Sequence, residues 1–166
     1  MARASRGRSR AAAVLTAAVL AGAAAGCGGQ AQEVRDALAY TGEVNRVQGD
    51  FERDLGELRG AAGRAEVPAD VERAVGRLGR SIVGVQADLR RVDPPRTVAT
   101  EHRELIAAFG RWTPPLDAFR TALRGRRSAA SLRRARTAFV RDTGRAEREL
   151  STVATRINDR LRALSD

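Results

Sequence analysis

The chain has 166 residues, of which 43% are hydrophobic and 4% aromatic, and its 30 basic and 20 acidic residues give a formal net charge of +10. This length fits one domain, whose core must come mainly from Leu, Val, Ile and Ala. With 1 cysteine and 1 histidine, the composition excludes an intramolecular disulfide and leaves too few ligands for an ordinary zinc site.

The N-terminal segment has the layout of a secretory signal peptide. Residues 1–10 include four arginines and no acid, and residues 11–25 form an uncharged apolar stretch that ends in small residues. This stretch is shorter than the roughly 20 residues that cross a bilayer as a helix, and no later stretch comes closer. We therefore expect residues 1–26 to be a signal peptide and the mature chain to have no transmembrane helix. These residues hold 4 of the 30 basic residues and no acid, so the mature chain has a formal net charge of +6.

Cys27, the only cysteine, follows directly after Ala24, Ala25 and Gly26. In an exported protein, a lone cysteine is left with a free thiol, an intermolecular bridge or a covalent modification. The group resembles the lipobox of bacterial lipoproteins, in which small residues precede a cysteine that is lipidated. The resemblance implies that Cys27 becomes the mature N-terminus and anchors the protein to the outer face of the cell membrane, on its periplasmic or extracellular side. The alternative is cleavage at an Ala-x-Ala site such as Ala23–Ala25, which would release a soluble protein with a spare thiol.

Beyond the cysteine, apolar residues recur at alternating steps of four and three, the coiled-coil type of spacing that indicates amphipathic helices. Gly60 and Gly63 are expected to close the first helix, and Pro68 with Asp70 to open the second. The core positions are Ala37, Thr41, Val44, Gln48, Phe51, Leu55 and Leu58 in the first helix, and Val71, Val75, Leu78, Ile82, Val85, Leu89 and Val92 in the second.

The third helix is expected to begin with Asp93 as its N-cap and Pro94 in its first position. Its apolar phase continues through Pro114 and Pro115, which predicts a bend that keeps the same face inward, with Thr113 as a cap for the restart. The core positions are Val98, His102, Leu105, Phe109, Trp112, Leu116, Phe119 and Leu123.

Gly125 is expected to end the third helix and Ser128 to cap the fourth. Glu and Arg interleave on the outward faces, as in Glu101 with Arg103 and Glu147 with Arg148, which is typical of solvated surface. The core positions of the fourth helix are Leu132, Ala135, Phe139, Ala146, Leu150, Val153, Ile157, Leu161 and Leu164.

The chain lacks period-two alternation and Asn-Gly or Asp-Gly turns, so no strand is expected. Four long amphipathic helices with short connections predict an all-α fold, an antiparallel up-and-down four-helix bundle. Cys27 and a short tether would occupy residues 27–30, and residues 31–166 would form a single domain. Anchoring at Cys27 would then leave the turns at Gly60–Pro68 and Arg124–Ser128 at the end far from the membrane.

His102, Phe109, Trp112 and Phe119 share the inward face of the third helix near the double proline. A kink there could open a small apolar pocket for a lipid-like ligand. The alternative is that these aromatic residues are ordinary core, and that His102 is a structural histidine bonded to a carbonyl or an acid. His102 has no co-ligands at metal-site spacing, and we expect no cofactor.

The densest basic cluster surrounds the turn between the third and fourth helices. Guanidinium groups pair well with phosphates and carboxylates, so the cluster is a candidate patch for an envelope polyanion or another envelope protein. The alternative is a solvated loop enriched by compositional bias. Nucleic acid is not an expected partner of an exported protein, and no aromatic platform is interleaved with these arginines. The candidate residues are Arg124, Arg126, Arg127, Arg133 and Arg134.

Residues 93–109 read DPPRTVATEHRELIAAF. This pattern of Pro-Pro, then His, then Leu is similar to one found among uncharacterised helical lipoproteins of high-GC Gram-positive bacteria, and it brings no known activity. No Gly-x-Ser-x-Gly elbow and no P-loop lysine is present, so we do not expect an enzyme. The sequence favours a lipid-anchored lipoprotein of the cell envelope that acts as a non-catalytic helical binding or interaction module. A small carrier or sensor bundle with an apolar ligand near the third-helix kink is the alternative.

Overall fold

The computed structural model describes residues 28–64, 68–125 and 128–164, and all regular structure in these ranges is helical. The fold class predicted from the sequence, all-α, is confirmed there, and no strand occurs in the same ranges. The elements are α1 (Gly28–Arg64), α2 (Pro68–Leu89), the 3-10 helix η1 (Arg96–Val98), α3 (Ala99–Gly110), α4 (Thr113–Arg124) and α5 (Ala129–Arg162).

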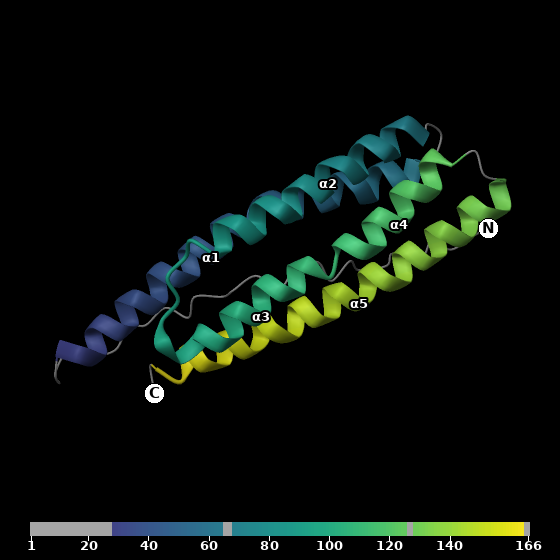
Figure 1. Ribbon diagram of the computed structural model, residues 1–166. Coiled ribbons are helices and arrows are strands. Elements are labelled where there is room, and N and C mark those ends of the chain that lie inside the picture. Colours follow the sequence, from purple (N-terminus) through teal and green to yellow (C-terminus); the bar gives the residue numbers. More distant parts are fainter. Residues whose placement is uncertain (1–27, 65–67, 126–127, 165–166) are drawn as a thin grey trace, which may run out of the picture.

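The long helices lie side by side and alternate in direction along the chain (Figure 1). Helix α1 packs closely against α2, while α3 and α4 follow one another along α5 and both also contact α2. Two helices in line, α3 and α4, therefore occupy the place of the predicted third helix. Within the described ranges, no helix is long and apolar enough to cross a membrane.

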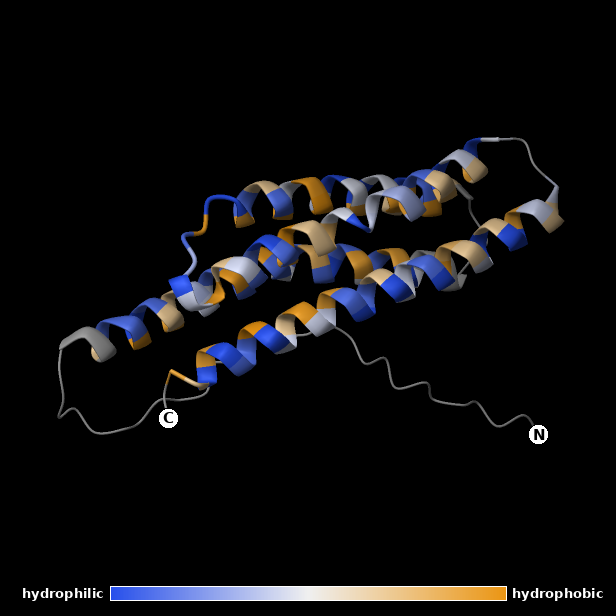
Figure 2. Ribbon diagram, turned by 60° about the horizontal axis from the view of Figure 1, so that its bottom comes forward, coloured by the Kyte–Doolittle hydropathy of each residue, from blue (hydrophilic) through white to orange (hydrophobic). Residues whose placement is uncertain are grey.

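Apolar and hydrophilic positions alternate along every long helix, so each helix has an apolar stripe (Figure 2). These stripes meet in one core, because no element can shield its apolar face from water alone. Nearly every predicted core position of α1 to α4 is buried, and the core also contains residues that the heptad pattern did not single out. The additional buried hydrophobic residues are Tyr40, Val47, Ala74, Ala108, Ala122 and Ala154.

From Ala31 onward, the first buried residue of α1 is Ala37, and none of the residues from Ala31 to Asp36 is buried. Since α1 begins at Gly28, residues 28–30 of the expected short tether are helical. The prediction that Gly60 and Gly63 close this helix is wrong, because α1 continues to Arg64. A glycine in a helix costs only about 1 kcal/mol relative to alanine, which packing along α1 can outweigh.

The start of α3 also differs from the expectation. Residues 93–95 have no regular structure, the short helix η1 follows at Arg96, and α3 begins only at Ala99. A residue that precedes proline is pushed out of the helical region, and this applies to both Asp93 and Pro94. Pro95 is extended, with ψ at 146°. Consecutive prolines thus delay the helix, and Asp93 is not its N-cap.

The bend at Pro114 and Pro115 is confirmed, with the same face inward on both sides. Helix α3 ends at Gly110, and α4 begins at Thr113, which is its first residue rather than its cap. The two prolines lie in the first turn of α4, where backbone N–H groups have no intrahelical partner and their loss costs little. The first helical bond of the restart runs from the Leu116 N–H to the Trp112 carbonyl at 3.3 Å.

Helix α5 begins as expected, because the Ser128 side chain accepts a hydrogen bond from the Ser131 N–H. Its two halves are packed differently. Every fully buried residue lies at Ala146 or beyond, whereas Leu132, Ala135 and Phe139 are only half-buried. The N-terminal half of α5 is therefore less completely covered than the heptad pattern predicts.

Candidate functional site

Cys27 lies outside the described residues, as do Arg126 and Arg127 of the candidate anion patch. The lipidation prediction at Cys27 therefore stays a prediction. Helix α1 begins at the next residue, Gly28. A lipid attached at Cys27 would thus be linked to the rest of the fold directly through helix α1.

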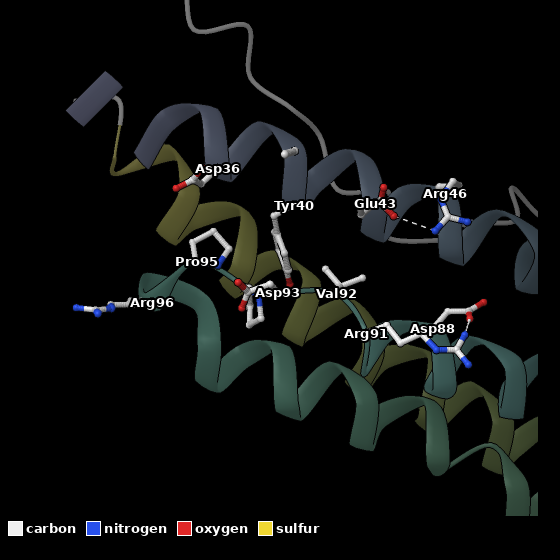
Figure 3. A pocket seen from close by; sticks show the side chains of 12 residues that line it. Asp36, Tyr40, Glu43, Arg46, Asp88, Arg91, Val92, Asp93, Pro95 and Arg96 are labelled. Atoms are coloured by element: carbon white, nitrogen blue, oxygen red, sulfur yellow. Dashed lines mark hydrogen bonds and ion pairs between the residues drawn. The ribbon is translucent and has the colours of Figure 1, made fainter. Parts of the chain in front are cut away.

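A groove with a volume of about 720 Å³ lies between α1 and the chain that links α2 to η1 (Figure 3). Its lining is mostly charged. Two ion pairs are closed within it, Arg46 with Glu43 at 2.8 Å and Arg91 with Asp88 at 2.7 Å. A second groove of about 410 Å³ runs between α1 and α2 and is again lined by alternating arginines and aspartates. Both grooves are open and polar, unlike the apolar pocket expected from the sequence.

Tyr40 lines the larger groove with its ring and sends its hydroxyl inward to His102. The His102 Nε2 lies 2.9 Å from the carbonyl oxygen of Leu89, which can only accept, so Nε2 carries the proton. Nδ1 must then accept from the Tyr40 hydroxyl, at 3.2 Å. Both ring nitrogens are satisfied in the neutral imidazole. The expected bond between His102 and a carbonyl is thereby confirmed.

This buried chain of hydrogen bonds joins three elements, with Tyr40 on α1, Leu89 at the end of α2 and His102 on α3. Burial lowers the pKa of His102, since the charged imidazolium is poorly solvated there, and the bond to the Leu89 carbonyl opposes this shift. Burial also raises the pKa of the Tyr40 hydroxyl, and the nearby Glu101 carboxylate adds to that effect. Both groups are thus held in their neutral forms near pH 7.

Glu101 is buried, although the sequence reading placed it on the solvated surface with Arg103. It accepts a hydrogen bond from the Arg160 Nε at 2.6 Å. The ion pair joins the start of α3 to the last turns of α5, and only the arginine side is well exposed. Its neighbour in sequence, Glu104, is paired with Arg156 in the same way. Sequence alternation of Glu and Arg does not distinguish such interhelical pairs from solvated charges.

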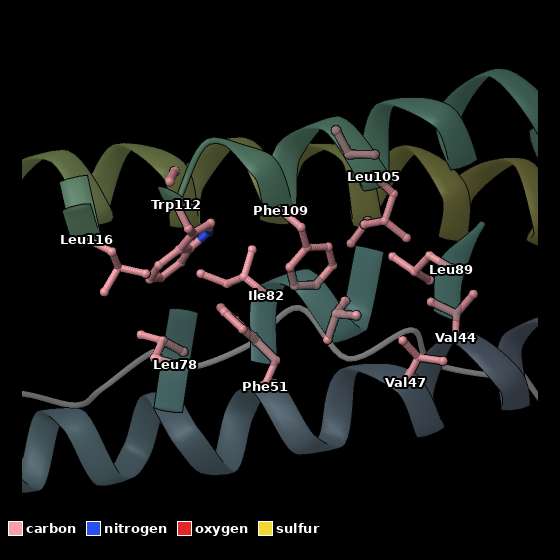
Figure 4. Close-up of a cluster of buried hydrophobic side chains, with 14 of the residues drawn as sticks. Val44, Val47, Phe51, Leu78, Ile82, Leu89, Leu105, Phe109, Trp112 and Leu116 are labelled. Carbon is pink, nitrogen blue, oxygen red and sulfur yellow. The ribbon is translucent and has the colours of Figure 1, made fainter. Parts of the chain in front are cut away.

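Of the candidate apolar pocket residues, Phe109 and Trp112 lie side by side in the core (Figure 4), whereas His102 and Phe119 contact other rings. Phe51 meets both Phe109 and Trp112 edge to face, with ring centroids 5.0 and 5.1 Å apart. Phe119 stacks on Phe139 at 4.7 Å. Phe109 and Trp112 are 0% and 1% exposed, and neither groove described above is lined by them. The indole Nε1 of Trp112 has no hydrogen-bond partner among the described residues.

Of the arginines predicted to bind anions, Arg124 is already paired with Glu72 at 2.6 Å. Arg133 and Arg134 are exposed on the first turns of α5, and no acidic partner contacts them in the described ranges. The predicted patch stays a prediction, because Arg126 and Arg127 lie outside the described residues. The sequence reading also missed arginines further along α5, at positions 145 and 148, which are equally exposed.

Among the described residues, no group of three or more His, Cys, Asp or Glu side chains could hold a metal ion. Comparisons of the chain with protein-family models, with curated proteins and with solved structures each found no match. Functional inference therefore depends on the residues and their geometry.

Proposed function

We propose that this protein is a lipid-anchored, non-catalytic interaction module on the outer face of the cell membrane, attached through Cys27. The observation that carries the proposal is the sequence of residues 1–27, in which a basic head, a short apolar core and small residues lead to the sole cysteine. The helical start at Gly28 supports it, because the folded part would then stand directly on its anchor.

The mature domain is proposed to be an up-and-down four-helix bundle. Contacts between helix ends support this arrangement. Tyr40 near the start of α1 meets His102 near the start of α3, and Arg160 near the end of α5 meets Glu101 at the same end. At the opposite end, Arg124 forms an ion pair with Glu72 of α2. Such pairing of ends is what alternating helix directions require.

A non-catalytic role is supported by the state of His102, the chain's single histidine. It is 4% exposed and both of its ring nitrogens are engaged, so it cannot exchange protons with a substrate in solution. The carrier alternative would need space for an apolar ligand beside Trp112, where the described aromatic rings are instead in mutual contact. No observation in this part of the core favours a bound apolar ligand.

Mass spectrometry of the mature N-terminus from the native host tests the anchor. The expected result is a chain that begins at Cys27 and carries the added mass of acyl chains, with no such mass in a Cys27→Ser variant. A chain that begins at Gly26 with a free Cys27 thiol would instead indicate ordinary cleavage after Ala25, and the anchor proposal would then be wrong.

A further inference from the structure

The outward face of α5 carries a row of arginines, Arg134, Arg141, Arg145 and Arg148, which we name the α5 strip. At 100° per residue these positions fall within an arc of about 60°, roughly opposite the core-facing positions, and they extend over about 21 Å at 1.5 Å per residue. All four are exposed. The row therefore runs along the helix axis as a narrow line of positive charge.

Among the described residues, an acidic partner neutralises Arg141 and leaves the rest of this line positive. Asp142 pairs with Arg141 at 2.9 Å, and its lowered pKa reflects that bond first and the more distant charge of Arg145 last. Arg134 and Arg148 have no acidic partner among the described residues. The other nearby acids are used elsewhere, since Glu147 pairs with Arg59 of α1 and Glu149 with Arg111.

From these contacts we propose that the α5 strip binds a linear polyanion, a flexible polymer whose repeating phosphate or carboxylate groups lie along the helix. Guanidinium groups are well suited to both, through paired N–H donors and weak hydration. Small residues, Thr137, Ala138 and Gly144, separate the arginines, which leaves the guanidinium groups accessible from the side. The inference deepens the proposed function, on which it rests, by giving the module a class of partner.

Two other partners fit the strip less well. A helix that lies on an anionic bilayer needs an exposed apolar face, whereas the apolar face of α5 is packed at Ala146, Val153 and Ile157. A protein partner would use exposed apolar anchors, and the described part of α5 offers one large apolar side chain of this kind, Val140, which is 62% exposed. A soluble polymer requires neither feature.

Binding would release the counterions of the polymer, so the affinity should decrease as the salt concentration rises. For a flexible single strand, the logarithm of the affinity falls with the logarithm of the salt concentration by about 0.7 per neutralised charge. The three arginines outside the Arg141–Asp142 ion pair, Arg134, Arg145 and Arg148, predict a slope of about −2.1, and hence a Kd that rises about 18-fold between roughly 50 and 200 mM salt. The slope, rather than the Kd alone, reports the number of arginines engaged.

The test uses the full mature lipidated chain in detergent, with linear polyphosphate and poly-L-glutamate as probes. The triple variant Arg134→Gln, Arg145→Gln and Arg148→Gln leaves only the ion-paired Arg141 and should remove most of this slope, so that the Kd changes by less than about twofold over the same salt range. A charge-matched control replaces Arg35, Arg80 and Arg90 by Gln. These arginines are exposed and lie on α1, on α2 and directly after α2, which do not pack closely against α5, so the control should keep the wild-type slope.

Equal loss of slope in both triple variants would show attraction by net charge alone and would overturn the strip. Stronger binding to phosphatidylglycerol than to phosphatidylcholine vesicles that is lost in the triple variant, without binding to either polymer, would assign the surface to a membrane and would overturn it as well. Circular dichroism confirms that both variants are folded. The result is separable from the anchor, because mass spectrometry of Cys27 does not depend on the strip, and an anchored chain without polymer binding would refute the strip alone.

Discussion

Replacing Tyr40 by Phe isolates one hydrogen bond in the buried chain that joins α1, α2 and α3. The phenyl ring keeps the edge-on contact with the His102 ring, whose centroid is 5.6 Å away, so packing is preserved. What is lost is the O–H that donates to Nδ1 at 3.2 Å. His102 is 4% exposed, so water does not readily replace that donor. Leaving a buried acceptor unsatisfied costs about 1–3 kcal/mol, and we expect Tyr40→Phe to lower the free energy of unfolding by this amount.

Urea unfolding near pH 7.5 measures the change, and an unchanged m-value would show that both states keep their compactness. Thr152→Val is a matched control, because it deletes an exposed hydroxyl bonded to the Arg148 carbonyl and should change stability by at most about 0.5 kcal/mol. The Tyr40 substitution should also cost less in a His102→Leu background, where no acceptor remains. A cost equal to that of the control, or the same cost in both backgrounds, would refute the assignment of Nδ1 as acceptor.

Three further predictions follow from other contacts. Burial lowers the pKa of His102 from 6.5, so the unfolded chain takes up a proton before the folded one as the pH falls below about 6.5, and the stability of the fold decreases. The melting temperature should therefore fall with pH in this range, and this dependence should disappear in His102→Gln. Gly49→Ala should raise the free energy of unfolding by about 0.5–1 kcal/mol, because a Cβ there meets nothing within 4 Å. Gly110→Ala should give no gain, because its Cβ would lie 2.9 Å from the Gln86 amide nitrogen, which donates to the Ile106 carbonyl. Equal effects of the two substitutions in chemical denaturation would contradict this. Phe51→Ala should lower the free energy of unfolding by about 3–5 kcal/mol, since Phe51 is 3% exposed and contacts two aromatic rings. A decrease below about 1.5 kcal/mol in the same assay would contradict this and show that neighbouring side chains fill the cavity.

The helices could be predicted because their apolar residues recur with the helical period. Each of the positions from Leu105 to Phe119 in the predicted pattern is buried, even across the break at Pro114. The ends were harder to predict, because backbone preferences at Asp93 and Pro94 compete with the capping signal. Glycines at the end of α1 were over-interpreted, since a weak local preference was taken as a stop.

The candidate site was less predictable for a different reason. Sequence periodicity shows that His102 faces inward, but its partners, Tyr40 and the Leu89 carbonyl, lie 62 and 13 residues away in the chain. Charge compensation is similarly non-local, since Arg124 is neutralised by Glu72. Which arginines are left without acids is decided by interhelical pairing, and this information is absent from any single stretch of sequence.

In a chain held at Cys27, the first turns of α1, before the buried Ala37, would separate the packed domain from the membrane. Nine helical residues raise the packed domain by about 14 Å if α1 stands upright on the membrane. The electrostatic potential of a charged lipid surface decays over about 8 Å at physiological ionic strength, so the domain would begin beyond most of that field. At low salt the decay length grows past the height of this helical stalk, and the same basic domain would then be drawn towards the lipid that it normally stands clear of.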